Sequence, residues 1–291
     1  MVRLGGKAVS EFILNRISED TQSFINQGNR APSLAVVLVG ENPASVTYVG
    51  KKTELAERLG FMHFQFNLCE DCKESELLAL IDRLNSDDEV DGILVQLPLP
   101  SHISEKKVID RINPEKDVDG FTDINTGRLC IGEDSFVPCT PLGILRMLEY
   151  YNIPTSGKRA VVIGRSNIVG KPMAMLLAQK GIDATVTLCN SKTPDLKEYT
   201  KNADIIVVAT GCVNTIDSSY VKDGAAVIDV GVNRIEDKSK EKGFRLVGDV
   251  DYASFIERDV MVSPVPGGVG LMTVTMLMEN TLKAAKNRRG K

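Results

Sequence analysis

The sequence of 291 residues has no tryptophan, and only 5% of its residues are aromatic. Stacked aromatic rings are the usual platform for single-stranded nucleic acid, so we expect no such partner. Only two histidines are present, His63 and His102, which excludes a histidine-rich metal centre in one chain. The formal net charge is −4, and this slight acidic excess favours neither nucleic acid nor a membrane surface as a binding partner.

Long apolar runs are missing as well. No stretch reaches the roughly 18 residues of a membrane span, and the first residues lack the apolar segment of a secretion signal. Of the six cysteines, Cys69 and Cys72 form a single Cys-x-x-Cys pair, without the second pair that a zinc site needs. We predict that the cysteines are reduced structural thiols, and a redox role for Cys69 and Cys72 is the alternative. We also predict that the protein binds no metal and is cytoplasmic.

The composition that remains, 43% hydrophobic and 25% charged, is typical of a globular protein, and the length suggests two domains. In the first half, continuous apolar runs at 34–39 and 92–97 predict strands buried on both faces, with a further strand at 61–68. Because helices are expected around these strands, we predict a parallel sheet covered by helices. The helical spacing of apolar residues places these helices at 9–27, 43–59 and 75–84.

The second half repeats this β/α plan after a polar, Gly/Pro-rich stretch at 98–141, which holds one short helix predicted at 104–112. Thr140 and Pro141 suit the start of a helix that reaches about Tyr151. We place the domain boundary at the end of the polar stretch, just before this helix. The predicted fold class is therefore α/β with two domains. The later strands and helices are expected at 159–163, 170–180, 184–188, 194–201, 204–209, 225–230, 260–262 and 271–286.

The segment from Gly164 to Pro172 directly follows a predicted strand and opens a helix. Backbone N–H groups and the helix dipole at such a turn can receive a pyrophosphate, although the spacing departs from G-x-G-x-x-G. The next strand ends in Asn190-Ser191-Lys192, without the carboxylate that holds the ribose of NAD. Arg165, Ser191 and Lys192 could instead hold a 2′-phosphate, which favours NADP. A plain strand-to-helix turn is the alternative.

Polar residues near the ends of the first predicted strands are further candidates. Tyr48 and Lys52 are four residues apart and share one face of a helix. Gln96 ends an apolar strand, where its amide needs hydrogen-bond partners. It can bond to nearby backbone, to a ligand or to Lys52. An exposed amphipathic pair is the alternative for Tyr48 and Lys52.

Two turns complete the set of candidates. Lys116-Asp117-Val118-Asp119-Gly120 places two carboxylates in a turn, where they act as turn formers or as ligands. The run from Pro264 to Thr273 holds three glycines before a helix. Its residues Pro266, Gly267 and Gly268 can allow close approach of an anion or a flat substrate, with a purely structural loop as the alternative.

Taken together, these segments resemble the bifunctional methylenetetrahydrofolate dehydrogenase/cyclohydrolase family, from about Leu34 to Thr281. Six motifs occur in the family's order, which makes coincidence implausible. They are Ser45-x-x-Tyr48-Val49-x-x-Lys52, Val95-Gln96-Leu97-Pro98-Leu99-Pro100, Lys116-Asp117-Val118-Asp119-Gly120, Pro138-Cys139-Thr140-Pro141, Gly164-Arg165-Ser166-x-x-Val169-Gly170-x-Pro172 and Pro266-Gly267-Gly268-Val269-Gly270.

The resemblance implies an α/β protein with a parallel-sheet folate domain and a Rossmann-type NADP domain. The folate domain would span 1–139 and be completed by the C-terminal helix 271–291. The NADP domain would span 140–270. The resemblance also implies an active site in the cleft between the domains and a homodimer.

The same resemblance implies roles for single residues. Lys52 matches the catalytic lysine and Gln96 the amide that tunes it. Tyr48 matches the tyrosine that stacks beside the aminobenzoate ring of the folate, and Asp119 matches the carboxylate that anchors the pterin. The cofactor contacts fall on Gly164, Arg165, Ser166, Ser191 and the backbone of Val232.

The sequence departs from the family pattern at three positions. Glu54 stands where a second lysine is common, and we expect it to be solvated because it lies on another helix face than Lys52. Leu271 replaces a proline after the Gly-rich loop, which removes that residue's fixed φ. Asn190 replaces a histidine before Ser191.

The function implied is oxidation of 5,10-methylenetetrahydrofolate by NADP⁺, followed by hydrolysis of the methenyl product to 10-formyltetrahydrofolate. The substrates are tetrahydrofolates, with or without a polyglutamate tail. One alternative is a monofunctional dehydrogenase of the same fold. Another is a folate- or nucleotide-binding regulatory protein without turnover. The folate-side motifs disfavour a third, an NADP-linked dehydrogenase of a small acid.

Overall fold

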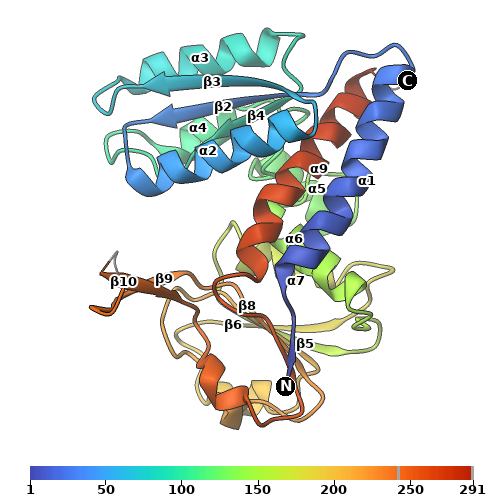
Figure 1. Cartoon of the computed structure of the whole chain (residues 1–291), viewed down its shortest axis with the longest axis vertical. Coiled ribbons are helices and arrows are strands. Elements are labelled where there is room, and N and C mark those ends of the chain that lie inside the picture. The colour runs from blue at the N-terminus through green and yellow to red at the C-terminus, as the bar shows by residue number, and fades with distance from the viewer. Residues whose placement is uncertain (241–242, 290–291) are drawn as a thin grey trace. The chain divides into compact units, whose positions relative to one another are not determined.

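The computed structural model describes residues 1–240 and 243–289, and its chain divides into two compact units (Figure 1). No helix in these residues is both long and apolar enough to cross a membrane. Each unit contains one parallel sheet. Unit 1 consists of Met1–Glu11, Leu129–Glu133 and Thr140–Thr273, and unit 2 consists of Phe12–Arg128, Asp134–Cys139 and Val274–Lys291.

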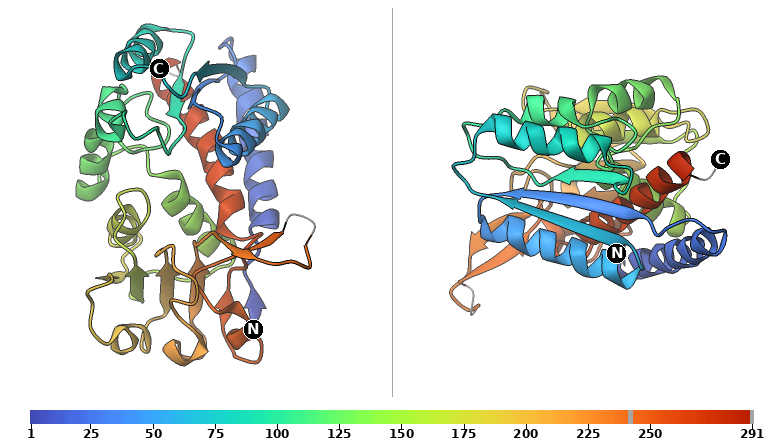
Figure 2. Two further views of the ribbon diagram at one scale, coloured as in Figure 1. Left: turned by 90° about the vertical axis from the view of Figure 1, so that its left-hand side faces the viewer. Right: turned by 90° about the horizontal axis from the view of Figure 1, so that it is seen from above.

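The sheet of unit 2 has three parallel strands in the order β3-β2-β4. β2 (Ser33–Val39) is buried along its whole length, because it lies between β3 (Met62–Leu68) and β4 (Gly92–Val95). Helix α2 (Pro43–Arg58) covers one face of the sheet, and α3 (Glu74–Ser86) covers the other, as the right-hand view of Figure 2 shows. Parallel strands need such crossover helices, so the layers follow directly from the β-α alternation in the sequence.

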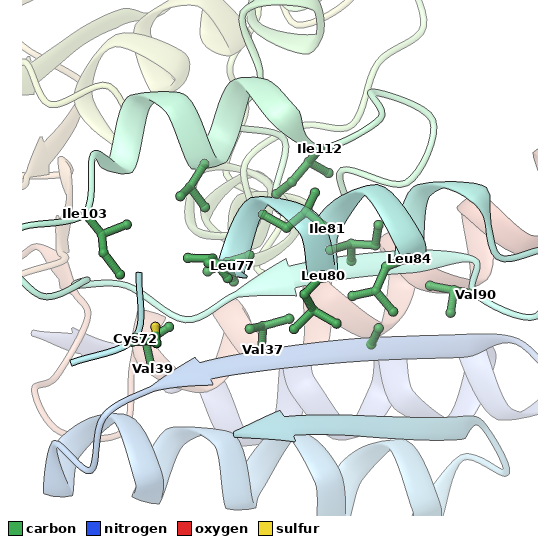
Figure 3. Close-up of a cluster of buried hydrophobic side chains, with 14 residues drawn as sticks. Val37, Val39, Cys72, Leu77, Leu80, Ile81, Leu84, Val90, Ile103 and Ile112 are labelled. Carbon is green, nitrogen blue, oxygen red and sulfur yellow. The ribbon is translucent and has the colours of Figure 1, made fainter. Parts of the chain in front are cut away.

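A cluster of buried aliphatic side chains fills the space between the sheet and α3 (Figure 3). Val37 points from β2 toward Leu77 and Leu80 of α3, and Val39 lies beside Cys72 at the end of the strand. Apolar residues of α3 recur at positions 77, 80, 81 and 84, which places them on one stripe of the helix. Helix α4 (Glu105–Arg111) closes the cluster through Val108.

Two long helices contribute to both units, since the unit boundaries fall within α1 (Gly6–Asn26) and α9 (Val269–Arg289). In unit 2 their parts are joined by an ion pair between Lys286 Nζ and Asp20 Oδ2 at 2.7 Å. The end of α9 also reaches the sheet, because Arg288 and Arg289 pair with the buried carboxylate of Asp91. The basic last turn of α9 therefore has a structural role, because it neutralises a buried carboxylate next to β4.

The sheet of unit 1 has six strands in the order β1-β11-β8-β7-β5-β6, and every neighbouring pair is parallel. The chain runs from β5 to β6 on one side and then to β7 on the other side of β5. The direction of strand addition reverses between β5 and β7, so the carboxyl ends of these two strands form a topological switch point. The strands are β1 (Val2–Arg3), β5 (Arg159–Ile163), β6 (Thr185–Cys189), β7 (Ile205–Val208), β8 (Ala226–Asp229) and β11 (Met261–Val262). The helices within unit 1 are most of α6 (Cys139–Tyr150), α7 (Gly170–Leu177), α8 (Leu196–Thr200) and the short 3₁₀ turns Ser218–Tyr220 and Tyr252–Phe255.

The α/β fold class with a parallel sheet in each part is confirmed, and most predicted elements agree with the structure within a few residues. Besides the two 3₁₀ turns, three strands and one helix were not predicted. The antiparallel hairpin of β9 (Asn233–Glu236) and β10 (Phe244–Val247) is short and highly charged. β1 has only two residues and depends on its pairing with β11.

The helix that was not predicted is α5 (Asp123–Ile131), inside the polar stretch at 98–141. Its sequence contains Gly127 and shows weak apolar periodicity. A start signal was nevertheless present, because the Thr122 hydroxyl accepts from Asn125 N at 3.3 Å and Asp123 follows in the first turn.

The two compact units differ in extent from the predicted ranges 1–139 and 140–270. Residues 1–11 and 129–133 belong to unit 1, and unit 1 extends to Thr273. Helix α9 starts at Val269, two residues before the predicted start at Leu271. The assignment of these ranges to folate and NADP, and the expected cleft between them, stay predictions.

Candidate active site

Helix α2 places Lys52 inside unit 2 and leaves Tyr48 at its surface. Lys52 is 8% exposed, whereas Tyr48, one helical turn earlier, is 43% exposed. Glu54 is exposed on another face, as predicted. Burial lowers the pKa of the Lys52 ammonium, although the charge of Asp119 opposes that shift. The helix therefore presents a poorly solvated amine beside an accessible aromatic ring.

Gln96 holds that amine in place. Lys52 Nζ donates to Gln96 Oε1 at 2.8 Å, and Gln96 Nε2 donates to the carbonyl of Leu97 at 2.7 Å. A carbonyl can only accept, so the NH₂ group of the amide must face Leu97 and its oxygen must face Lys52. Of the partners considered for Gln96, both backbone and Lys52 are present. This orientation offers the lysine an acceptor without an opposite charge.

The two carboxylates of the 116–120 turn have different environments. Asp117 is 1% exposed, and its oxygens accept from the backbone N–H groups of Gly120, Phe121 and Thr122 at 2.8–3.2 Å and from Asn125 Nδ2 at 2.9 Å. Asp117 is therefore a turn former. The neighbouring Lys116 is structural as well, because its Nζ donates to carbonyls at the end of α3.

Asp119, in contrast, lies in the field of Lys52. Burial raises the pKa of its carboxyl to about 6, with a smaller contribution from the charge of Asp117, while the Lys52 charge opposes the rise. The Cys139 thiol lies 3.9 Å from Asp119 Oδ1. A carboxylate that is partly buried and faces a lysine, with few donors of its own, is suited to bind a ligand.

Cys139 and Asn280 also belong to this site, although neither was predicted as a site residue. Asn280 Nδ2, on α9, donates to the carbonyls of Val118 and Val137 at 2.8 and 3.1 Å, and it approaches Cys139 Sγ at 3.8 Å. Cys139 belongs to the motif Pro138-Cys139-Thr140-Pro141, and this motif could have indicated it as a site residue. Asn280 lies more than 130 residues away, and only the fold brings it to the turn.

In unit 1 the segment 164–170 forms a tight loop between β5 and α7. Gly164 has a φ of 120°, and a Cβ built there would overlap the carbonyl of Ala209. A Cβ on Gly170 would overlap the carbonyl of Gly164. Ser166 Oγ accepts from the N–H groups of Val169 and Gly170, at 3.2 and 3.3 Å, where the loop meets the start of α7. The loop thus brings its backbone close to the helix start, as a dinucleotide site requires.

The other predicted cofactor residues lie at the carboxyl ends of the strands of unit 1. Arg165 and Ser191 are exposed, after β5 and β6, and Val232 is 52% exposed after β8. Asn190 shapes the turn after β6, because its Oδ1 accepts from Lys192 N at 3.0 Å. Parallel strands send all these segments to one edge of the sheet.

The Gly-rich loop at 264–270 has a clear structural role and also belongs to unit 1. A Cβ on Gly268 would crowd the carbonyl of Pro264, and Gly6 packs against the Gly268 carbonyl so closely that a side chain on Gly6 would overlap it. Gly6 N donates to Gly267 O at 2.8 Å. The geometry explains these glycines by backbone packing. The predicted contact of Pro266, Gly267 and Gly268 with substrate stays a prediction.

The structure therefore brings together Lys52, Gln96 and Asp119 in unit 2, with Tyr48 on the same helix as Lys52. The predicted cofactor residues Gly164, Arg165, Ser166, Ser191 and Val232 lie in unit 1. Among the described residues, no cluster of three or more histidine, cysteine, aspartate or glutamate side chains is suited to a metal ion.

Comparison with known proteins agrees with this division. Residues 4–119 match the catalytic domain model of tetrahydrofolate dehydrogenase/cyclohydrolase, and residues 138–289 match its NAD(P)-binding domain model. The chain belongs to this family. The predicted substrate-side residues Tyr48, Lys52, Gln96 and Asp119 fall in the catalytic domain model. The predicted cofactor residues fall in the NAD(P)-binding model.

Individual members of the tetrahydrofolate dehydrogenase/cyclohydrolase family are similar over nearly the whole chain. The bifunctional protein FolD of Flavobacterium johnsoniae is 50% identical and covers 100% of this chain and 99% of its own length. The crystal structure of the bifunctional enzyme from Campylobacter jejuni has a TM-score of 0.93 and 49% identity, and covers 99% of both chains. The Trypanosoma brucei dehydrogenase-cyclohydrolase, solved with NADP and an inhibitor, has a TM-score of 0.92 and 38% identity, and covers 99% and 98%.

The contrast between Asp117 and Asp119 gives a matched pair of substitutions. Asp117→Asn removes an acceptor oxygen and turns an NH₂ group toward buried N–H donors, so we expect a loss of about 2–3 kcal/mol in the free energy of unfolding. Asp119→Asn should instead raise that free energy at pH 7.5. The native pKa of about 6 lies above the unfolded value near 3.9, so ionised Asp119 destabilises the fold.

Urea unfolding at several pH values checks both expectations. The gain from Asp119→Asn should shrink as the pH falls from about 6 toward about 4, because the native wild-type carboxyl becomes protonated in that window. Equal destabilisation by the two substitutions at pH 7.5 would contradict the different roles assigned to these carboxylates.

Proposed function

We propose that the protein oxidises 5,10-methylenetetrahydrofolate with NADP⁺ and hydrolyses the methenyl product to 10-formyltetrahydrofolate. The observation that carries this proposal is the buried Lys52 amine held by Gln96 beside Asp119. It occurs in a chain that is 50% identical, over its full length, to a protein named as bifunctional.

The hydrolytic step depends on Lys52. Water must lose a proton as it attacks the electrophilic methenyl carbon, and a ring nitrogen must gain a proton when the carbon–nitrogen bond breaks. An ordinary lysine, with a pKa of roughly 10.4, is almost fully protonated near neutrality and is a poor base. Burial lowers the Lys52 pKa and so increases the fraction of neutral amine. The Gln96 oxygen accepts one N–H of this amine. The remaining hydrogens of the nitrogen, or its lone pair when it is neutral, point in other directions and are free to act on a substrate.

Tyr48 and Asp119 are the proposed folate-binding groups. The exposed ring of Tyr48 offers an apolar face for the aminobenzoate ring. Asp119, with a pKa of about 6, is largely ionised at neutral pH and can accept hydrogen bonds from the N–H groups of the pterin. A fixed pterin brings the reacting carbon to a defined place, and positioning of this kind is a large part of what hydride transfer requires.

Unit 1 is the proposed NADP site. The residues present fit the cofactor, since the 164–170 loop allows close backbone approach at the start of α7 and Arg165 supplies a cation. Arg165 and Ser191 would hold the 2′-phosphate, Gly164 and Ser166 would lie at the pyrophosphate, and the backbone of Val232 would contact the nicotinamide end. When bound, NADP⁺ supplies the hydride acceptor.

Substitution of Lys52 by methionine tests the bifunctional assignment. The side chain keeps its length but loses its amine, so cyclohydrolase activity should fall by about 10²–10⁴-fold, the usual contribution of proton transfer. Part of the dehydrogenase activity should remain. Both activities and the folate Kd are measured on the same folded preparation, with Lys51→Met, an exposed neighbour on α2, as the matched control.

Unchanged hydrolysis in Lys52→Met would exclude this lysine as the catalytic group. Wild-type protein that forms NADPH but leaves the methenyl product intact would instead indicate a monofunctional dehydrogenase. Wild-type protein that binds folate without any turnover would indicate a regulatory binding protein.

Substitution of Arg165 by alanine tests the cofactor assignment. The ratio of kcat/KM for NADP⁺ over NAD⁺ should fall by an amount equivalent to roughly 1–3 kcal/mol, the range for charge-assisted hydrogen bonds. Arg159→Ala is the control, because Arg159 is exposed at the opposite end of β5. Equal efficiency of the wild-type protein with both cofactors would refute the proposed 2′-phosphate site.

We also propose a cytoplasmic homodimer. The six cysteines are free thiols, which suits a reducing compartment. Edge strand β3 supports the dimer, because exposed backbone at a sheet edge can pair with a second copy about a two-fold axis. Sedimentation should give about twice the chain mass of 31.7 kDa. Gln65→Glu with Asn67→Glu, at exposed positions of β3, should shift the protein toward the monomer, and a monomeric wild type would contradict the proposal.

A further inference from the structure

Unit 1 contains two buried aspartates to which the proposed function gives no role. Asp229 is 2% exposed and Asp249 is fully buried. Asp229 ends β8, directly before the segment that contains Val232. Asp249 lies twenty residues later, after the β9–β10 hairpin. Buried carboxylates are costly unless they are well hydrogen-bonded, so their partners indicate what they do.

Asp249 connects two turns at the carboxyl edge of the sheet. Its Oδ2 accepts from the backbone N–H groups of Thr210 and Gly211, at 2.6 and 2.8 Å, in the turn that follows β7. Its Oδ1 accepts from Asn233 Nδ2 at 2.9 Å, in the segment that follows β8. One carboxylate therefore fixes the distance between these two backbone segments.

Asp229 fixes the backbone around Asp249 by hydrogen bonds. Its Oδ1 accepts from Asp249 N at 2.9 Å and from Gly231 N at 3.0 Å, and its Oδ2 accepts from Val250 N at 3.1 Å. The chain direction at Asp249 and the turn before Val232 are thus set by the same carboxylate. Together the two aspartates form one network behind the ends of β7 and β8.

Two glycines leave room for this network. A Cβ on Gly231 would overlap the carboxylate of Asp249, and a Cβ on Gly248 would overlap the carboxylate of Asp229. Close contact of this kind leaves the carboxylates little freedom to move. The segments that they hold are therefore rigidly defined parts of the site.

The network borders the predicted dinucleotide loop. Ala209 N, one residue before the Asp249-bound turn, donates to the carbonyl of Ile163 at the end of β5. A Cβ on Gly164 would overlap the carbonyl of Ala209. The turn at 209–211 is thus packed against the start of the dinucleotide loop at the switch point of the sheet.

We propose that Asp249, supported by Asp229, is the positioning residue for the nicotinamide end of the dinucleotide. This inference rests on the proposed NADP site, and it adds residues that act through the backbone rather than by touching the cofactor. Asp249 fixes the 210–211 turn and the 231–233 segment relative to each other, so that the backbone at Val232 meets the nicotinamide in one defined geometry. Asp229 and Asp249 bond to the segments after β7 and β8, whereas Arg165 and Ser191, proposed for the 2′-phosphate end, follow β5 and β6.

A carboxylate is needed because both oxygens must accept. An amide at position 249 has one acceptor oxygen, and its NH₂ group would face either the two turn N–H groups or the donor Nδ2 of Asn233. Asp249→Asn should therefore disturb one of the two segments. Asn233→Asp added to Asp249→Asn restores a donor–acceptor pair with the roles exchanged, and keeps the net charge of the wild type.

Calorimetric titration with NADP⁺ and with 2′-phospho-ADP-ribose, which lacks the nicotinamide, tests the proposal. Asp249→Asn should weaken NADP⁺ binding about tenfold or more, the range for a hydrogen bond to a charged group, and should leave binding of the fragment unchanged. The double variant should recover part of the affinity. Recovery is partial because Asn233 Nδ2 also donates to the carbonyl of Gly248, a bond that the exchange removes.

Asp251→Asn is the matched control, since it makes the same charge change on the same segment at a residue outside these turns. It should bind both ligands as the wild type does. If Asp249→Asn does not fold, Asn233→Ala replaces it, because this change removes only the bonds made by Asn233, including that to Asp249, and should also weaken NADP⁺ binding selectively.

The outcomes separate this inference from the proposed function. Wild-type protein that binds neither ligand would overturn the NADP site itself, and this inference with it. Tight binding by the wild type with equal losses for NADP⁺ and the fragment in Asp249→Asn would mean a general structural role and overturn the positioning role alone. Unchanged NADP⁺ binding in the folded variants would overturn it as well.

Discussion

Both units depend on one geometric constraint: in a parallel sheet, every segment that follows a strand leaves from the same edge. In unit 2 this edge receives α2 after β2 and Gln96 after β4, which lets Lys52 and Gln96 meet. In unit 1 it receives the loop after β5 and the turns after β6, β7 and β8. Residues distant in sequence gather there because hydrogen-bond pairing keeps neighbouring strands about 4.8 Å apart.

Burial of charge is the second theme, and its effect depends on the partners of each group. Asp117 and Asp249 are almost fully buried and surrounded by N–H donors, so each stabilises a backbone shape. Lys52 and Asp119 have fewer hydrogen-bond partners. Burial lowers the pKa of Lys52 and raises the pKa of Asp119, so in both groups it favours the neutral form. The same desolvation thus accompanies a fixed backbone where hydrogen bonds compensate it and a shifted pKa where they do not.

Close backbone approach explains the positions of several glycines better than flexibility does. Gly164 and Gly170 bring the start of α7 against the loop after β5, and Gly231 and Gly248 admit the two buried carboxylates. At each of these positions a Cβ would overlap a carbonyl or a carboxylate. Glycine is required there by space, and at Gly164 also by its φ of 120°.

The sequence by itself determined the α/β plan, most strands and helices, the family, and the candidates Tyr48, Lys52, Gln96 and Asp119. These follow from local signals: apolar runs, helical spacing and short motifs whose residues lie close together in the chain. The spacing of the 116–120 turn does not tell Asp117 and Asp119 apart, and only the family resemblance singled out Asp119. The tertiary structure supplied the physical reason, because the backbone N–H donors of the turn surround Asp117 and not Asp119. It also decided the roles of Asn280 and Asp249, because their partners lie in other segments and no local pattern encodes a contact between distant residues.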